Sequence, residues 1–225
     1  MATLSGAAAL KPLIVELQKA DTCGDYDRAL KTANKIIRSY PKEGFAYKAK
    51  LVALIQLGQF DEAAEFISET PVAKIGNVAF ENAYINYRKN NNEKALELLE
   101  KADQSDPAIT ELRAQIFYRM EKFNEAREVL TNILKSSTDD DDTLRRANLI
   151  AVECQLEANN VPVEPEKDLS GFEQMYNVAC HLIEREKYPE ALKLLDKALN
   201  TCKETMTADG VSEEDIDEEL AVILV

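Results

Sequence analysis

The sequence contains little glycine, proline and histidine. Seven glycines and seven prolines in 225 residues argue against long flexible linkers. The single histidine, His181, gives no basis for a multi-histidine metal site or a histidine-activated nucleophile, and we expect it to be a helix-packing or surface histidine. Glycine-rich phosphate loops, GxSxG and HExxH patterns are also missing. We therefore expect no enzyme activity, no cofactor, no bound metal and no small-molecule substrate.

Cysteine and long apolar runs are also limited. The four cysteines form no CxxC pair and lie inside helical patterns, which is typical of reduced thiols in a cytoplasmic protein. Near the N-terminus, Lys11 and Pro12 interrupt the apolar run, so no signal peptide is recognisable. Nothing approaches the roughly 18 apolar residues that span a bilayer. We expect a cytoplasmic protein without membrane insertion.

Basic residues are outnumbered, with 27 Lys and Arg against 41 Asp and Glu and a net charge of −14. This balance disfavours a general nucleic-acid surface, which needs clustered cations. Residues 1–60 nevertheless hold nine basic against five acidic residues. A solvated helix face explains this best, and contact with RNA or an acidic partner is the alternative. The acidic run 139–142 is interpreted as a helix start, because it lacks the spacing of a calcium loop.

One motif recurs through the chain. The stretch GDYDRAL at 24–30 has echoes at 58–64, 90–96, 121–127 and 186–192. The gaps between the alanines of successive echoes are 34, 32, 31 and 65 residues, for Ala29, Ala63, Ala95, Ala126 and Ala191. A period near 34 is typical of tetratricopeptide repeats. We therefore predict an all-α fold, a right-handed α-solenoid of tetratricopeptide-type helix hairpins.

Each echo has the chemistry of a helix–turn–helix corner. Gly24 and Gly58 are expected to end the first helix in two of the stretches, and acidic residues suit the start of the second helix. The alanine allows the two helices to approach closely. An aromatic residue is expected to wedge between the helices at Tyr26, Phe60, Phe123 and Tyr188.

We expect a single solenoid over 9–225. Its regular units cover about 10–43, 44–75, 76–106, 107–137 and 172–203. An irregular unit covers 138–171, because prolines and a glycine in VPVEPEKDLSG replace its second helix. A further helix starts within 213–225, and its apolar end leads us to expect that the natural protein continues beyond Val225.

Such a solenoid presents a concave groove, lined mostly by the first helix of each hairpin, that suits an extended or helical peptide. Alignment on the repeated alanines places a set of aromatic, arginine and asparagine side chains on this face, and these types are typical of interfaces. The candidates are Phe80, Tyr84, Tyr87, Arg88, Tyr118, Arg119, Asn148, Tyr176 and Asn177. The alternative is that the tyrosines only pack between repeats.

A cochaperone-like adaptor that grips C-terminal tails is the second hypothesis. Such clamps need lysine and asparagine at set positions of the first helices. The asparagine positions of the first three units hold Val15, Ala49 and Glu81, and only Asn177 fits. A carboxylate clamp is therefore poorly supported. An RNA-binding module built on the basic first unit is the third hypothesis.

In their order, DYDRALKTANKIIRSYP, KLVALIQLGQFDEA, FENAYINYRKNNNEKAL, ELRAQIFYRMEKFNEA and YNVACHLIEREKYPEALKLLDKA resemble the N-terminal repeats of the family of 72-kDa signal recognition particle subunits. The resemblance covers nearly all of residues 20–225. It implies a non-catalytic protein that binds the C-terminal part of the 68-kDa subunit and supports co-translational targeting to the endoplasmic reticulum. The family binds particle RNA through a basic segment near its C-terminus that is absent here, so RNA contact is expected only indirectly.

Overall fold

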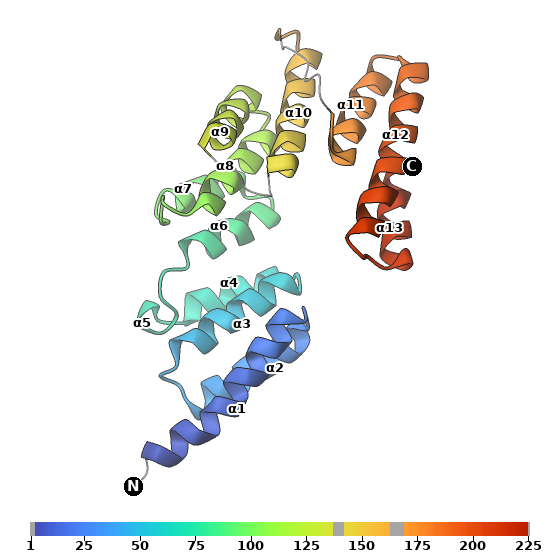
Figure 1. Cartoon of the computed structure of the whole chain (residues 1–225). Helices are drawn as coiled ribbons and strands as arrows, with labels where there is room; N and C mark the ends of the chain where they lie inside the picture. The colour runs from blue at the N-terminus through green and yellow to red at the C-terminus, as the bar shows by residue number, and fades with distance from the viewer. Residues whose placement is uncertain (1–2, 137–141, 163–168, 225) are drawn as a thin grey trace. The chain divides into compact units, whose positions relative to one another are not determined.

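The structure, a computed structural model, describes residues 3–136, 142–162 and 169–224. Within these ranges the regular secondary structure is entirely helical (Figure 1). The chain divides into two compact units, Met1–Ile109 and Thr110–Val225.

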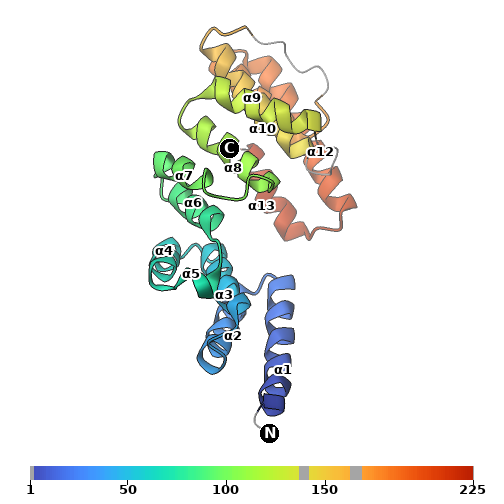
Figure 2. The same ribbon diagram turned by 90° about the vertical axis from the view of Figure 1, so that its left-hand side faces the viewer.

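The first unit holds seven helices and the start of an eighth among its described residues. They are α1 (Thr3–Thr22), α2 (Tyr26–Ser39), α3 (Gly44–Gln56), α4 (Phe60–Glu69), the short α5 (Val72–Ile75), α6 (Ala79–Arg88), α7 (Asn92–Leu99) and the start of α8 (Pro107–Arg119). Each helix packs on a near neighbour in the chain, as α6 and α7 do in Figure 2. Helix α4 ends at Glu69, just before Pro71. Helix α1 runs through Pro12 and begins before the first predicted unit.

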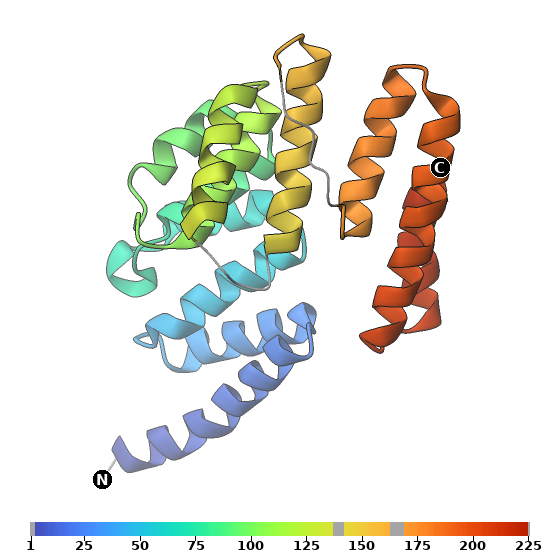
Figure 3. The same ribbon diagram turned by 45° about the horizontal axis from the view of Figure 1, so that its top comes forward.

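The second unit holds most of α8 and five further helices among its described residues. They are α9 (Phe123–Ser136), α10 (Asp142–Ala158), α11 (Phe172–Glu184), α12 (Tyr188–Ala208) and α13 (Glu213–Leu224). Helices α10, α11 and α12 lie side by side in chain order (Figure 3). Between α10 and α11 the described residues form no helix, as predicted for the irregular unit. Residues 163–168 of the predicted loop and 139–141 of the acidic run lie outside the described residues.

Among the described residues, seven helix ends share one backbone conformation. In each, a residue with φ between 59° and 75° follows the helix: Gly24, Gly58, Asn90, Glu121, Asn160, Glu186 and Gly210. The amide of the next residue donates a hydrogen bond to the carbonyl five positions earlier, as from Asp25 to Ala20 (2.9 Å) and from Lys122 to Phe117 (2.9 Å). This pair of features defines the Schellman helix ending, and it satisfies carbonyls that the helix leaves open. Every echo of the repeat therefore begins on a left-handed residue, whether or not that residue is glycine.

The repeated alanines are the buried contacts of the corners. Ala29, Ala63, Ala95, Ala126 and Ala191 are at most 3% exposed. The predicted wedge aromatics Tyr26, Phe60 and Phe123 pack against the cores of their units.

The prediction is wrong for Tyr188, which is 59% exposed. Tyr188 and Leu192 lie one turn apart on α12, and both side chains are exposed.

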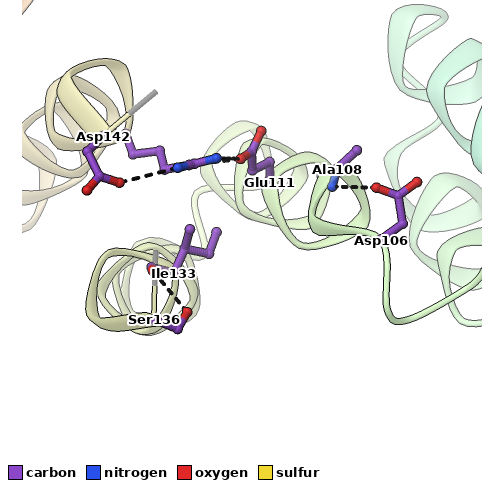
Figure 4. A network of polar contacts seen from close by, with 7 residues as sticks. Asp106, Ala108, Glu111, Ile133, Ser136 and Asp142 are labelled. Carbon is purple, nitrogen blue, oxygen red and sulfur yellow. Dashed lines mark hydrogen bonds and ion pairs between the residues drawn. The ribbon is translucent and has the colours of Figure 1, made fainter. Parts of the chain in front are cut away.

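The irregular unit is held by buried polar groups. The Arg145 side chain of α10 is only 7% exposed. Its Nε lies 2.8 Å from Glu111 Oε1 on α8, and its Nη1 lies 3.3 Å from Asp142 Oδ1 (Figure 4). The buried Gln174 of α11 accepts from the Ser170 amide and donates to the Thr143 carbonyl of α10. These contacts join α10 to α8 and to α11.

Replacing Glu121 with glycine should stabilise the protein. A left-handed backbone costs an L-residue about 1 kcal/mol, which glycine largely avoids. We expect Glu121→Gly to raise the free energy of unfolding by roughly 0.5–1 kcal/mol in urea denaturation. The matched control, Glu125→Gly in the first turns of α9, should lower it by a similar amount. Equal destabilisation by both variants would contradict the left-handed backbone conformation of Glu121.

Replacing Arg145 with leucine should weaken the second unit. Removing one partner of a buried pair leaves the carboxylates uncompensated. Because Glu111 is one-third exposed, we expect a loss of only about 2 kcal/mol in the free energy of unfolding. The exposed neighbour provides the control, and Arg146→Leu should change stability by less than about 0.5 kcal/mol.

Candidate functional site

Three of the predicted residues form one cluster on α6. The guanidinium of Arg88 donates to the hydroxyl of Tyr84 (2.9 Å) and lies 4.8 Å from the centre of the Phe60 ring. The rings of Tyr84 and Tyr87 are 6.4 Å apart, centre to centre. Phe80 is half-buried on the same helix. The cluster thus presents an aromatic and cationic surface of the kind that anchors protein partners. Contact with a partner remains a prediction for all four residues.

A hollow of about 370 Å³, the first hollow, lies in the first unit. Helices α1, α2 and α3 line it with Leu17, Gln18, Asp21, Tyr26, Ala29, Phe45, Lys48, Ala49, Val52 and Ala53. Our sequence analysis did not propose Phe45 or Val52. A signal was present, because α3 carries more apolar residues than one buried face needs. Tyr47, Leu51 and Leu54 fill the core and leave Phe45 40% exposed.

The cation at this hollow is already paired. Lys48 Nζ lies 2.5 Å from Glu81 Oε1 and donates to the carbonyl of Asn77 (3.0 Å). A clamp for a terminal carboxylate depends on a cation facing the ligand. The pairing therefore adds to the missing asparagines as an argument against such a clamp.

A hollow of about 240 Å³, the second hollow, lies in the second unit among α8, α10 and α11. Its lining is Tyr118, Ala151, Cys154, Gln155, Asn177, Cys180, His181 and Glu184. It brings together two predicted residues from helices far apart in the sequence, Tyr118 and Asn177.

The other three predicted residues of the second unit do not line this hollow. Arg119 and Asn148 are exposed on α8 and α10. Tyr176 packs against the buried cluster around Met175 and Cys202. These placements leave their roles as predictions.

Asn177 has a structural task of its own. Its Nδ2 donates to the carbonyl of Ala147 on α10 (2.9 Å). A side-chain amide has two donors and one acceptor oxygen, so this bond uses part of its capacity. The predicted hydrogen bonds from Asn177 to a peptide backbone would therefore use only the donor and acceptor capacity that the bond to Ala147 leaves.

The second hollow is acidic in character, with Glu184 in its lining. Burial, followed by the charges of Glu157, Glu153 and Glu184, raises the pKa of Cys154 to about 11. Burial is also the main cause that raises the pKa of Tyr118. Both groups therefore stay protonated at neutral pH, so Cys154 is a poor nucleophile.

Among residues 3–136, 142–162 and 169–224, three or more His, Cys, Asp or Glu side chains nowhere gather as metal ligands. Over the same part of the chain, each helix is too short or too polar to cross a bilayer.

Cys154 and Cys23 should differ in their rates of alkylation. Only about one Cys154 thiol in a thousand is ionised at pH 8, given a pKa of about 11, and the side chain is partly buried. We expect iodoacetamide to modify Cys154 at least about tenfold more slowly than the exposed Cys23, as followed by peptide mass spectrometry. The urea-unfolded chain is the control, in which both should react alike. Equal rates in the folded protein would contradict the burial of Cys154.

Comparisons with known proteins agree with this architecture. The SRP TPR-like family, described as "Putative TPR-like repeat", matches residues 22–155, and a "Tetratricopeptide repeat" family matches residues 173–209. Signal recognition particle subunit SRP72 of Caenorhabditis elegans is 44% identical over 221 residues, covering 98% of this chain and 35% of that protein. The Homo sapiens protein of the same name is 37% identical, covering 97% of this chain and 33% of that protein.

The chain thus spans about a third of the length of the curated relatives it matches. The solved structure of YrrB, described as "a TPR protein with an unusual peptide-binding site", aligns with a TM-score of 0.48 at 16% identity, over 75% of this chain and 91% of that one. The sequence match covers more than half of the chain, and the helix hairpins repeat with the expected period. The chain therefore belongs to the SRP TPR-like repeat family, and its fold is a tetratricopeptide-type helical solenoid.

Proposed function

We propose that this chain is a non-catalytic interaction module of the signal recognition particle. Two observations together support the proposal. The chain belongs to the SRP TPR-like repeat family, and the first helices of its hairpins line open, partly apolar hollows. Tetratricopeptide folds use this face to hold peptides. The module acts in the cytoplasm, in co-translational targeting of ribosomes to the endoplasmic reticulum.

The partner in this proposal is a C-terminal segment of the 68-kDa subunit. Phe45 and Val52 in the first hollow offer apolar contacts, and the Tyr84–Arg88 cluster on α6 offers aromatic and cationic ones. Buried aromatic and arginine anchors of this kind contribute most of the affinity in many interfaces. Particle RNA is reached through other parts of the assembly, since this chain carries a net charge of −14.

Isothermal titration of the 225-residue chain with the C-terminal segment of the 68-kDa subunit tests the proposal. We expect saturable binding that Phe45→Ala weakens by about tenfold, because truncating an interface aromatic typically costs 1–2 kcal/mol. Val72→Ala is the matched control, since Val72 is 72% exposed on α5 and lines neither hollow. Absence of binding by a chain with a normal helical melting curve would overturn the proposal. Equal affinity of both variants would remove the first hollow from the site.

A further inference from the structure

The second hollow contains a buried hydrogen-bonding atom without a partner. The His181 side chain is 8% exposed. Its Nε2 lies 3.2 Å from Glu157 Oε2, whereas its Nδ1 is buried and has no hydrogen-bond partner among the described residues. Buried polar atoms are rarely left unpaired in native proteins, so each exception needs an explanation.

The contact with Glu157 decides which nitrogen carries the hydrogen. An ionised carboxylate can only accept hydrogen bonds, so His181 Nε2 must be the donor in this contact. In a neutral imidazole the other nitrogen, Nδ1, is then an acceptor. An occupant of the hollow that satisfies His181 must therefore bring an N–H or O–H donor.

The charges around the hollow favour a cation as this donor. Glu184 lines the hollow, and its Oε2 lies 3.8 Å from His181 Nδ1, too far for a hydrogen bond between them. Because Nδ1 is buried, the His181 ring must tilt toward the hollow for a nitrogen with several hydrogens to bond both Nδ1 and Glu184 Oε2 at about 2.9 Å. The two oxygens of Glu157 are engaged by His181 and Arg185, so Glu184 is the carboxylate left to meet the occupant.

The size and walls of the hollow suit a long side chain. A volume of about 240 Å³ is several times the roughly 30 Å³ that one water occupies. Tyr118 and Ala151 supply apolar surface next to the polar end. Lysine and arginine have this form, with an apolar stem and a charged tip.

We propose that the second hollow binds the cationic end of a lysine or arginine side chain on the docked peptide, with His181 Nδ1 and the Glu184 carboxylate as its acceptors. This inference rests on the proposed function, because it needs a peptide on the first helices of the hairpins. It adds a chemical requirement for one position of the partner segment.

The sole histidine of the chain gives a specific probe. Nitrogen-15 NMR at pH 8 should show one imidazole, with its hydrogen on Nε2. The 225-residue chain is titrated in one arm with the C-terminal segment of the 68-kDa subunit, and with forms of it in which each lysine is acetylated or each arginine replaced by citrulline in turn. In a second arm the titrant is butylguanidinium chloride, with tetramethylammonium chloride as the ion that cannot donate.

The inference predicts that the segment shifts the Nδ1 signal and that neutralising one particular cation weakens binding by about tenfold. It also predicts that Glu184→Gln weakens binding about threefold, while the matched control Glu190→Gln, outside the hollow, has no effect. His181→Gln should remove the preference for the cation, and a melting curve checks that this variant folds. If it does not fold, Glu184→Gln and the NMR signal still decide.

The outcomes separate the two proposals. Binding of every neutralised segment with unchanged affinity and an unmoved Nδ1 signal would overturn the cation site and leave the interaction module intact. A shift by butylguanidinium but not by tetramethylammonium, without binding of the segment, would support the cation site and overturn the partner. If the segment does not bind and butylguanidinium does not shift the Nδ1 signal, both the cation site and the interaction with the 68-kDa subunit would be overturned.

Discussion

The rest of the structure depends on one repeated constraint, the left-handed corner, which closes over a buried alanine in the five repeated stretches. The positive φ at residues such as Gly24 and Glu121 reverses the chain within one residue and satisfies a carbonyl of the preceding helix. The alanine five residues later allows the second helix to approach, as the full burial of Ala63 and Ala126 indicates. These corners determine where the first helix of a hairpin ends and where the second begins.

The sequence predicted this framework because its elements are local and repeat. Turn residue and alanine lie within six positions, so the period and the hairpins could be read directly. The sequence was a poorer guide to which side chains are exposed, because that depends on tertiary packing. Tyr188 occupies a wedge position, but the packing of α12 leaves it 59% exposed although Ala191 is buried. The Asn160 corner was hidden because its alanine is missing. Phe45 was overlooked because only the structure reveals which apolar residues of α3 the core leaves unused.

The two hollows differ because their walls are stabilised differently. In the first unit, apolar contacts among Leu17, Ala29 and Ala53 hold α1, α2 and α3 together, and the hollow between them has apolar walls. In the second unit, Arg145, Gln174 and Asn177 connect α10 to α8 and α11 through hydrogen bonds and ion pairs. Polar groups are therefore available at its hollow, and they include the imidazole that the irregular unit leaves half satisfied.

The extensive helix pairings join helices that are neighbours, or next neighbours, along the chain. Contacts of such short sequence separation cost little loop-closure entropy, so each hairpin can nucleate without waiting for distant segments. Growth from one hairpin to the next, rather than a single global collapse, is the kinetic behaviour of repeat arrays. A nascent chain of this kind can begin to fold as soon as its first pair of helices has been synthesised.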